Sequence, residues 1–146
     1  DYDVKNHPEV DKEVALIDTI LGRESGANWR EANSMLQQIM KDYIGMKLRS
    51  ETLMKAGIKY IRDLRKYSLA QLKADNSHEL MRTLEVLDLI AVGEAVALMS
   101  ENRKESRGRC HQRSDYTFTN PLLHNKFQTI EKTKDGFSLE FRAKVR

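Results

Sequence analysis

The chain contains few cysteine, proline and aromatic residues, and this composition argues against several classes of structure. Its single cysteine, Cys110, has no partner among the 146 residues, so no internal disulfide is expected and a cytoplasmic setting is predicted. Two prolines and 7% aromatic residues disfavour an all-β sandwich. The length suits one domain, and its abundant Leu, Ile, Met, Val and Ala favour helices.

Long hydrophobic runs are also missing. The most apolar region, 87–99, is interrupted by Asp88 and Glu94, and it is shorter than the roughly 18 residues of a membrane span. The first residues are polar and acidic, unlike a signal peptide. The sequence therefore predicts a chain without a membrane span.

Motifs for nucleotide binding and for common hydrolytic reactions are absent from the sequence. The seven glycines form no G-x-G-x-x-G turn, and there is no P-loop, G-x-S-x-G or H-E-x-x-H motif. None of the four histidines pairs with another at helical spacing, which disfavours a metal centre. We therefore predict no catalytic, cofactor-binding or metal-binding residue on this chain.

Apolar residues at helical spacing indicate four helices, of which the first two are well delimited. The first follows Pro8, a residue tolerated in the first helical turn, and ends at Gly22. The second begins at Asn28, which forms a capping box with Glu31, and ends at Gly45. The inner face of the first helix is predicted to carry Val10, Val14, Ile17 and Leu21.

The third and fourth helices are longer. Ser50 is a suitable N-cap for the third, which is expected to end near 75–76, and Ser77 is the predicted cap of the fourth, which fades at 101–102. Gly93 is expected to allow close helix packing. The inner face predicted for the fourth helix consists of Leu80, Leu84, Leu87, Ala91, Ala95 and Leu98.

The character of the sequence changes after Gly108. Segments 126–131 and 137–142 alternate apolar and polar residues around Asp135-Gly136, which predicts a β-hairpin. The fold class is therefore mainly α: a three- to four-helix, spectrin-repeat-like bundle over 1–108. An extended basic loop and a C-terminal hairpin follow over 109–146, which pack on the bundle or on another domain and complete one domain.

The C-terminal part of the chain is basic. Residues 103–146 contain eleven Lys or Arg and five Asp or Glu, whereas the whole chain has a net charge of only +3. This segment is compatible with a surface that docks on another protein domain, with an anion or nucleic-acid patch, or with a solvated loop. Glu101 and Glu105 lie four residues apart among cations and are predicted to form surface ion pairs.

One stretch carries a family resemblance. Glu105-Ser106-Arg107-Gly108, followed by His111-x-Arg113-x-Asp115-Tyr116, resembles the E-S-R-G-x-H-x-R-x-D-Y-P signature of the fumarate reductase/succinate dehydrogenase flavoproteins, with L-aspartate oxidase and adenylylsulfate reductase as relatives. The resemblance is to their C-terminal helical domain and spans most of 28–142. The sequence departs from the signature by one extra residue before His111 and by Thr117 in place of proline.

The resemblance implies an FAD-dependent parent oxidoreductase whose cofactor and chemistry belong to other domains. The helical domain of such enzymes packs against the FAD-binding domain of the same polypeptide and can contact an iron–sulfur subunit. Five residues are accordingly predicted to hold this chain to the flavin domain: Arg107, His111, Arg113, Asp115 and Tyr116. The alternatives are a free-standing helical interaction module and a weak nucleic-acid binder that uses the basic tail.

Overall fold

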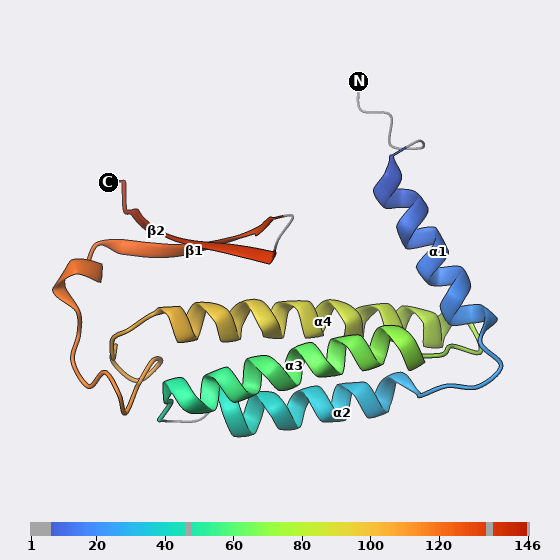
Figure 1. Ribbon diagram of the computed structural model, residues 1–146, viewed down its shortest axis with the longest axis horizontal. Coiled ribbons are helices and arrows are strands. Elements are labelled where there is room, and N and C mark those ends of the chain that lie inside the picture. Colours follow the sequence, from blue (N-terminus) through green and yellow to red (C-terminus); the bar gives the residue numbers. More distant parts are fainter. Residues whose placement is uncertain (1–6, 46–47, 134–135, 146) are drawn as a thin grey trace.

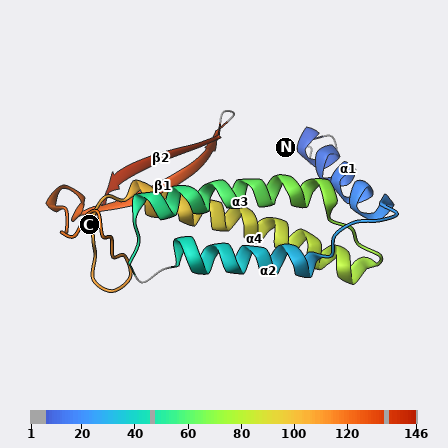
Figure 2. The ribbon, with the colours of Figure 1, turned by 60° about the horizontal axis from the view of Figure 1, so that its bottom comes forward.

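The computed structural model describes residues 7–45, 48–133 and 136–145. Within them, four α-helices precede an antiparallel β-hairpin, which confirms the predicted mainly α fold (Figure 1). Three helices lie side by side in an elongated bundle: α2 (Trp29–Ile39), α3 (Glu51–Gln71) and α4 (Ser77–Asn102) (Figures 1 and 2). The remaining elements are α1 (Pro8–Gly22), a π-helical turn η2 (Met40–Ile44), a 3-10 turn η3 (Pro121–Leu123), β1 (Lys126–Thr133) and β2 (Gly136–Ala143).

Side-chain caps set the helix starts. Asn28 and Glu31 form the predicted capping box of α2, and the Ser50 hydroxyl accepts the Leu53 N–H at the start of α3. The cap of α4 is Asn76 instead of the predicted Ser77, because the Asn76 amide oxygen accepts the Glu79 N–H at 3.0 Å. Helix α3 ends at Gln71, before the predicted 75–76, because the chain then turns into extended backbone.

The core lies between α2, α3 and α4. Gly57 and Gly93 are buried within it, so the helices approach closely at these two points. The predicted inner face of α4 is wrong. The buried residues lie on the adjacent face of the helix and include Val86, Ile90 and Ala97. The predicted stripe is only half-buried, because part of it, around Leu87, lines an open hollow shared with Leu16 of α1 and Lys132 of β1.

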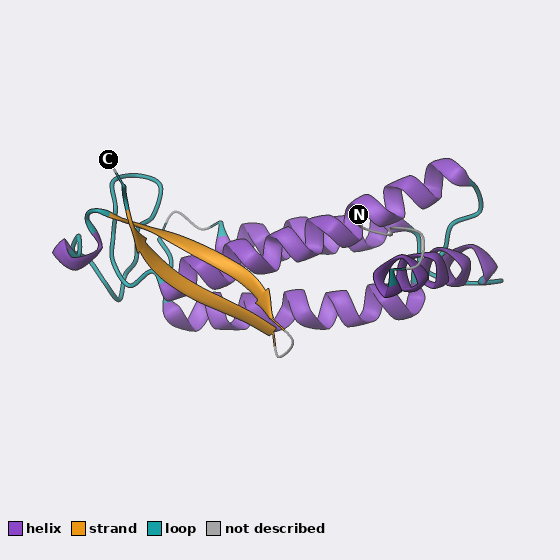
Figure 3. Cartoon of the chain, turned by 90° about the horizontal axis from the view of Figure 1, so that it is seen from above, coloured by secondary structure: helices purple, strands orange, loops and turns teal. Residues whose placement is uncertain are grey.

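Helix α1 lies at one end of the bundle and makes few contacts with it (Figures 1 and 3). Its bounds match the prediction, but Val14 and Leu21 of the predicted inner face are exposed, and Ile20 is its one fully buried residue among those described. The helix is attached mainly through its C-terminal end, where Arg23 donates to the Leu69 carbonyl at 2.7 Å. Most of the apolar stripe of α1 is therefore not buried against other parts of this chain.

The hairpin crosses above α4 (Figure 3). Its register pairs Lys126 with Ala143 and Ile130 with Leu139, so both strands are slightly longer than predicted. The guanidinium of Arg103, just after α4, lies 5.7 Å from the ring centroid of Phe141 and joins the sheet to the bundle. The predicted Asp135-Gly136 turn falls partly outside the described residues.

In the part of the chain that the structure describes, no helix combines the length and the hydropathy that a membrane-spanning segment requires.

Candidate functional site

The signature segment forms a braced turn at the end of the bundle, which we call the arginine turn and define as residues 103–120. Its tip reverses between Arg107 and His111, whose backbones exchange two hydrogen bonds. Gly108 has a φ of +49°, a conformation that L side chains rarely adopt, and the tip is exposed. The extra residue before His111 lies in this exposed tip, so it leaves the buried part of the turn intact.

Arg113 is the central residue of the arginine turn and its side chain is fully buried. Its guanidinium forms a two-pronged ion pair with Asp115, at 2.8 and 2.6 Å, and donates to the Glu101 carbonyl at 2.7 Å. The Asp115 carboxylate in turn accepts the Glu51 N–H at 2.9 Å. The pair thus satisfies the carboxyl end of α4 and the amino end of α3 together, with the charge that each helix dipole favours.

The electrostatics of this pair follow from its contacts. The hydrogen bond from Arg113 lowers the pKa of Asp115 from 3.8 to about 2, against the opposing effect of burial. The hydrogen bond to Asp115 raises the pKa of Arg113. Both groups are therefore charged across the neutral range, and the ion pair is permanent there.

His111 is buried and uses both ring nitrogens. Nε2 lies 3.0 Å from the Arg103 carbonyl oxygen and Nδ1 lies 2.9 Å from Nη1 of Arg49. Because a guanidinium only donates, Nδ1 accepts and Nε2 carries the proton, which defines a neutral imidazole. Burial lowers the pKa of His111, and the charges of Arg49, Arg113 and Arg103 lower it further, although the hydrogen bond to the Arg103 carbonyl opposes them.

Glu105 is fully buried, so its predicted surface ion pair is wrong. One carboxylate oxygen lies 2.7 Å from Nε of Arg103 and 3.3 Å from Nε of Arg107, and the other accepts the Asn120 N–H at 2.9 Å. Arg107 also donates to the His124 carbonyl at 3.0 Å. A single buried carboxylate therefore holds both sides of the loop that leads to the hairpin.

The structure brings the five predicted residues into one cluster. Arg113 and His111 are buried within this chain, Arg107 and Tyr116 are half-buried, and the ring of Tyr116 lies 4.8 Å from the guanidinium of Arg113. The side chain of Asp115 is 27% exposed. Their polar groups bond largely to other groups of this chain, so these residues fix the conformation of the turn.

Two residues of the cluster are absent from the prediction. Glu105 is the first residue of the signature, and its membership of that motif is the sequence signal by which it could have been predicted. Arg49 lies outside the signature, and its backbone pairs with the turn through the Gln112 carbonyl and the Ser114 N–H, at 2.9 and 2.8 Å. Nothing local in the sequence indicates this contact, because it joins segments about sixty residues apart.

Acid is expected to destabilise the arginine turn in two steps. The folded pKa of His111 lies below the unfolded value of 6.5, so stability is lost as the pH falls through 6.5 towards the folded pKa. Asp115 contributes a second loss between 3.8 and about 2. Urea unfolding at a series of pH values measures the first step, whose slope is at most about 1.4 kcal/mol per pH unit.

The matched variants for this pH series are His111→Gln and His78→Gln. The first removes the titrating group in the turn and flattens the slope below pH 6.5, whereas the second changes an exposed histidine and leaves it as it was. Equal slopes in all three proteins would mean that His111 does not titrate with folding.

Three large apolar side chains are exposed at the same end of the molecule, among polar and charged residues. Leu48 is 53% exposed, Phe118 57% and Leu122 78%. Leu48 borders the arginine turn beside Thr117 and Thr119, and the Phe118 carbonyl accepts the Ser106 N–H at 2.8 Å. We call these three side chains the turn-end patch. Large apolar side chains gathered at one end of a domain are typical of a contact surface.

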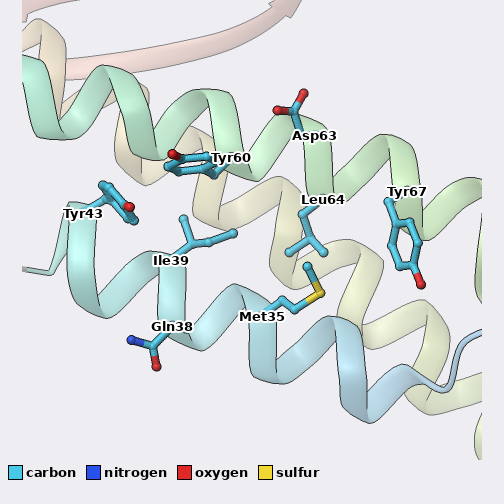
Figure 4. A pocket seen from close by; sticks show the side chains of 8 residues that line it. All are labelled: Met35, Gln38, Ile39, Tyr43, Tyr60, Asp63, Leu64 and Tyr67. Carbon is cyan, nitrogen blue, oxygen red and sulfur yellow. The ribbon is translucent and has the colours of Figure 1, made fainter.

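A second apolar surface lies between α2 and α3 (Figure 4). This groove has a volume of about 500 Å³ and its walls include Tyr43, Tyr60 and Tyr67. The rings of Tyr43 and Tyr60 lie 5.0 Å apart between centroids. The carboxylate among the lining residues, that of Asp63, is paired with Lys59 at 2.6 Å, so the groove offers packing surface and little chemistry.

The residues present do not fit a flavin. A dinucleotide requires a glycine-rich turn between a parallel strand and a helix, with backbone N–H groups directed at the phosphates. The described strands form an antiparallel hairpin instead, and the sequence has no such turn. The arrangement of these residues is that of a helical domain that is braced internally and has an apolar contact surface.

Comparison with known proteins identifies the family. The chain belongs to the family described as fumarate reductase flavoprotein C-term, which matches residues 33–144 and so includes the whole arginine turn. No curated protein sequence matches the chain.

Several solved structures share the fold. Adenylylsulfate reductase from the hyperthermophilic Archaeoglobus fulgidus is 23% identical over 85% of this chain and 20% of that chain, with a TM-score of 0.77. A variant of FrdA of E. coli quinol fumarate reductase is 25% identical over 92% of this chain and 24% of that chain, with a TM-score of 0.78. A chain of the Mycobacterium smegmatis Sdh1 complex is 19% identical over 92% and 23%, with a TM-score of 0.71.

The chain therefore spans only about a fifth to a quarter of the length of these solved chains. It is a C-terminal domain of the flavoprotein family.

Proposed function

We propose that this chain is the C-terminal helical domain of an FAD-dependent oxidoreductase of the fumarate reductase/succinate dehydrogenase type, and that it is not catalytic alone. It packs against the FAD-binding domain of the same polypeptide. The observation that carries the proposal is the conjunction of the family match over 33–144 with the lack of any flavin-binding turn. The bundle (1–108) and the loop with its hairpin (109–146) act as one domain, because Glu105 and Arg113 tie them together.

In this proposal the turn-end patch is the contact with the flavin domain. The five residues predicted to hold this interface contribute in two ways. Arg113 and His111 are buried and brace it from within the chain, whereas the other three keep exposed surface that can contact the flavin domain: Arg107, Asp115 and Tyr116. Burial of three large apolar side chains contributes on the order of 1.5–3 kcal/mol each to docking. The buried ion pairs beneath them fix the backbone that presents the patch, because Arg113 and Glu105 each bond to backbone groups on either side of it.

The parent enzyme of this proposal acts in the cytoplasm and includes an iron–sulfur subunit as a second partner. A similar solved chain comes from the Sdh1 complex, which supports assembly with further subunits. The single cysteine supports a reducing compartment.

The test uses this chain and the flavin-binding remainder of the parent polypeptide, expressed separately. The chain alone is expected to be colourless, and the mixture is expected to elute as one yellow complex in gel filtration. Phe118→Ser should weaken the complex about tenfold or more, because the turn-end patch loses its aromatic anchor.

The matched control is Tyr67→Ser, which removes an exposed aromatic side chain from the groove between α2 and α3. It should leave the complex unchanged. A yellow chain in isolation would overturn the assignment of the flavin to another domain, and a complex sensitive to Tyr67 but not to Phe118 would overturn the assigned surface.

A further inference from the structure

A second surface of the arginine turn is an open pocket between the turn, the end of α4 and the start of β1. Its volume is about 500 Å³, within the range of small-molecule sites. The pocket, which we call the basic pocket, is lined by Arg49, Met99, Ser100, Arg103, Arg107, Cys110, His111, Lys126, Phe127, Gln128 and Lys144. Five of these carry a permanent positive charge and none is acidic.

The positive charges of the basic pocket are only partly neutralised. Glu105 lies beneath the pocket and pairs with Arg103 and Arg107. Among the described residues no carboxylate pairs with Arg49, Lys126 or Lys144. Five cations against one carboxylate leave a local excess of four positive charges, and such an excess in a hollow attracts anions.

The donors in the basic pocket are held in place. The guanidinium of Arg49 is fixed by the Ile44 carbonyl at 2.7 Å and by Nδ1 of His111 at 2.9 Å. That of Arg107 is fixed by the His124 carbonyl at 3.0 Å. A guanidinium has five N–H donors, so each retains donors beyond those bonds, arranged in the fork that matches oxyanions.

We propose that the basic pocket binds an oxyanion with two or more negative charges, a phosphate or a polycarboxylate. Arg49 and Arg107 contribute pre-oriented N–H groups, and Lys126 and Lys144 close the pocket from the hairpin side as mobile charges. Such pairing is bidentate with arginine and point-like with lysine.

This inference does not depend on the proposed function. The turn-end patch and the basic pocket share the turn but use different side chains. Loss of docking to a flavin domain would leave anion binding intact, and a chain that binds no anion could still dock.

The test is calorimetric titration of the chain with inorganic phosphate and with citrate, against sodium chloride at matched ionic strength. Saturable binding of either anion is expected, and the anion that binds identifies the source of the charge as phosphate or carboxylate. In the double variant Lys126→Gln/Lys144→Gln the affinity should fall about fivefold or more, as two charges near the ligand are removed.

The matched control, Lys41→Gln/Lys66→Gln, removes two exposed helix lysines and should change the affinity less than about twofold, because these charges lie outside the pocket. Circular dichroism verifies the fold of both variants. No saturable binding of either anion, or an equal loss in the two double variants, would overturn the proposal.

Cys110 provides an independent localisation of the ligand. It is the only cysteine of the chain, it is exposed and it lines the basic pocket. Bound citrate or phosphate should slow its reaction with the anionic reagent dithionitrobenzoate much more than with neutral dithiodipyridine. Unchanged reaction rates with both reagents would place the anion elsewhere.

Discussion

Arg113→Met is expected to lower the free energy of unfolding by about 3 kcal/mol, which is the largest single effect we predict in this protein. The change removes the only charge facing the Asp115 carboxylate on the arginine turn and leaves the last carbonyls of α4 without their donor. Breaking a buried pair costs more than the pair itself contributes, because the remaining partner is left without compensation.

The size of this effect follows from burial. The Arg113 side chain has no exposed surface, whereas Asp115 remains 27% exposed and can regain water when its partner is lost. The expected loss therefore lies at the lower end of the range of about 3–5 kcal/mol for buried pairs. Urea unfolding followed by circular dichroism measures it directly.

Arg109→Met is the matched control. Arg109 lies four residues earlier on the same turn and is exposed, so the same change should alter stability by less than about 0.5 kcal/mol. In the double variant Arg113→Met/Asp115→Asn part of the loss should be recovered, because the uncompensated carboxylate is removed. Equal stability of the Arg113 and Arg109 variants would refute the bracing role of Arg113.

Gly57→Ala is expected to destabilise the bundle by about 1–3 kcal/mol, although alanine is the better helix former. A Cβ at Gly57 would lie 2.7 Å from the Cβ of Tyr43 and 2.7 Å from Cδ1 of Ile44. The Tyr43 atom is its Cβ, which is bonded directly to the backbone, so a change of side-chain rotamer cannot move it away. Overpacking therefore outweighs the propensity gain of up to about 1 kcal/mol.

Gly93→Ala is the matched comparison for this prediction. A Cβ there would lie 3.4 Å from Cδ1 of Leu36 and Sδ of Met40, which are the far ends of flexible side chains. The Gly93→Ala variant should keep the gain in helix propensity and should therefore be at least as stable as the parent protein. Thermal unfolding of the two variants side by side measures the difference, and a Gly57→Ala variant at least as stable as Gly93→Ala would contradict the observed packing of α3 against η2.

The helices could be predicted from the sequence because their signals are local. Asn28, Ser50 and Gly45 act through hydrogen bonds or backbone angles within a few residues. The π-helical turn η2 has no comparable signal. It places Ile44 in the core and brings Tyr43 against Gly57, a requirement set by another helix.

The inner faces of the helices were harder to predict. Helix α4 is apolar around most of its circumference, so Leu84 and Ile90 belong to equally plausible stripes, and the tertiary contacts decide which one is buried. Helix α1 shows the opposite situation, since its stripe is clear but it has little to pack against within the chain. Periodicity indicates a helix and does not specify its partner.

The candidate site shows the same division. The signature identifies Arg107, His111 and Arg113. Its spacing does not reveal that Arg113 and Asp115 together satisfy two helix ends, because the contact of Asp115 is with Glu51, some sixty residues away. Glu105 looks like a surface residue by its charged neighbours, yet the same neighbours neutralise it in the interior. Buried charges of this kind can be predicted from a sequence only when they belong to a recognisable motif, as Glu105 and Arg113 do here.

The central claim is that the arginine turn presents the turn-end patch to the flavin-carrying part of the parent polypeptide. Hydroxyl-radical footprinting of the chain alone and of the full-length flavoprotein tests it most directly, because it reports the exposure of single side chains. Oxidation of Leu48, Phe118 and Leu122 should fall several-fold in the full-length protein, while Tyr67 and Val92 react as before. Protection of Tyr67 or Val92 with the turn-end patch still reactive would contradict the claim.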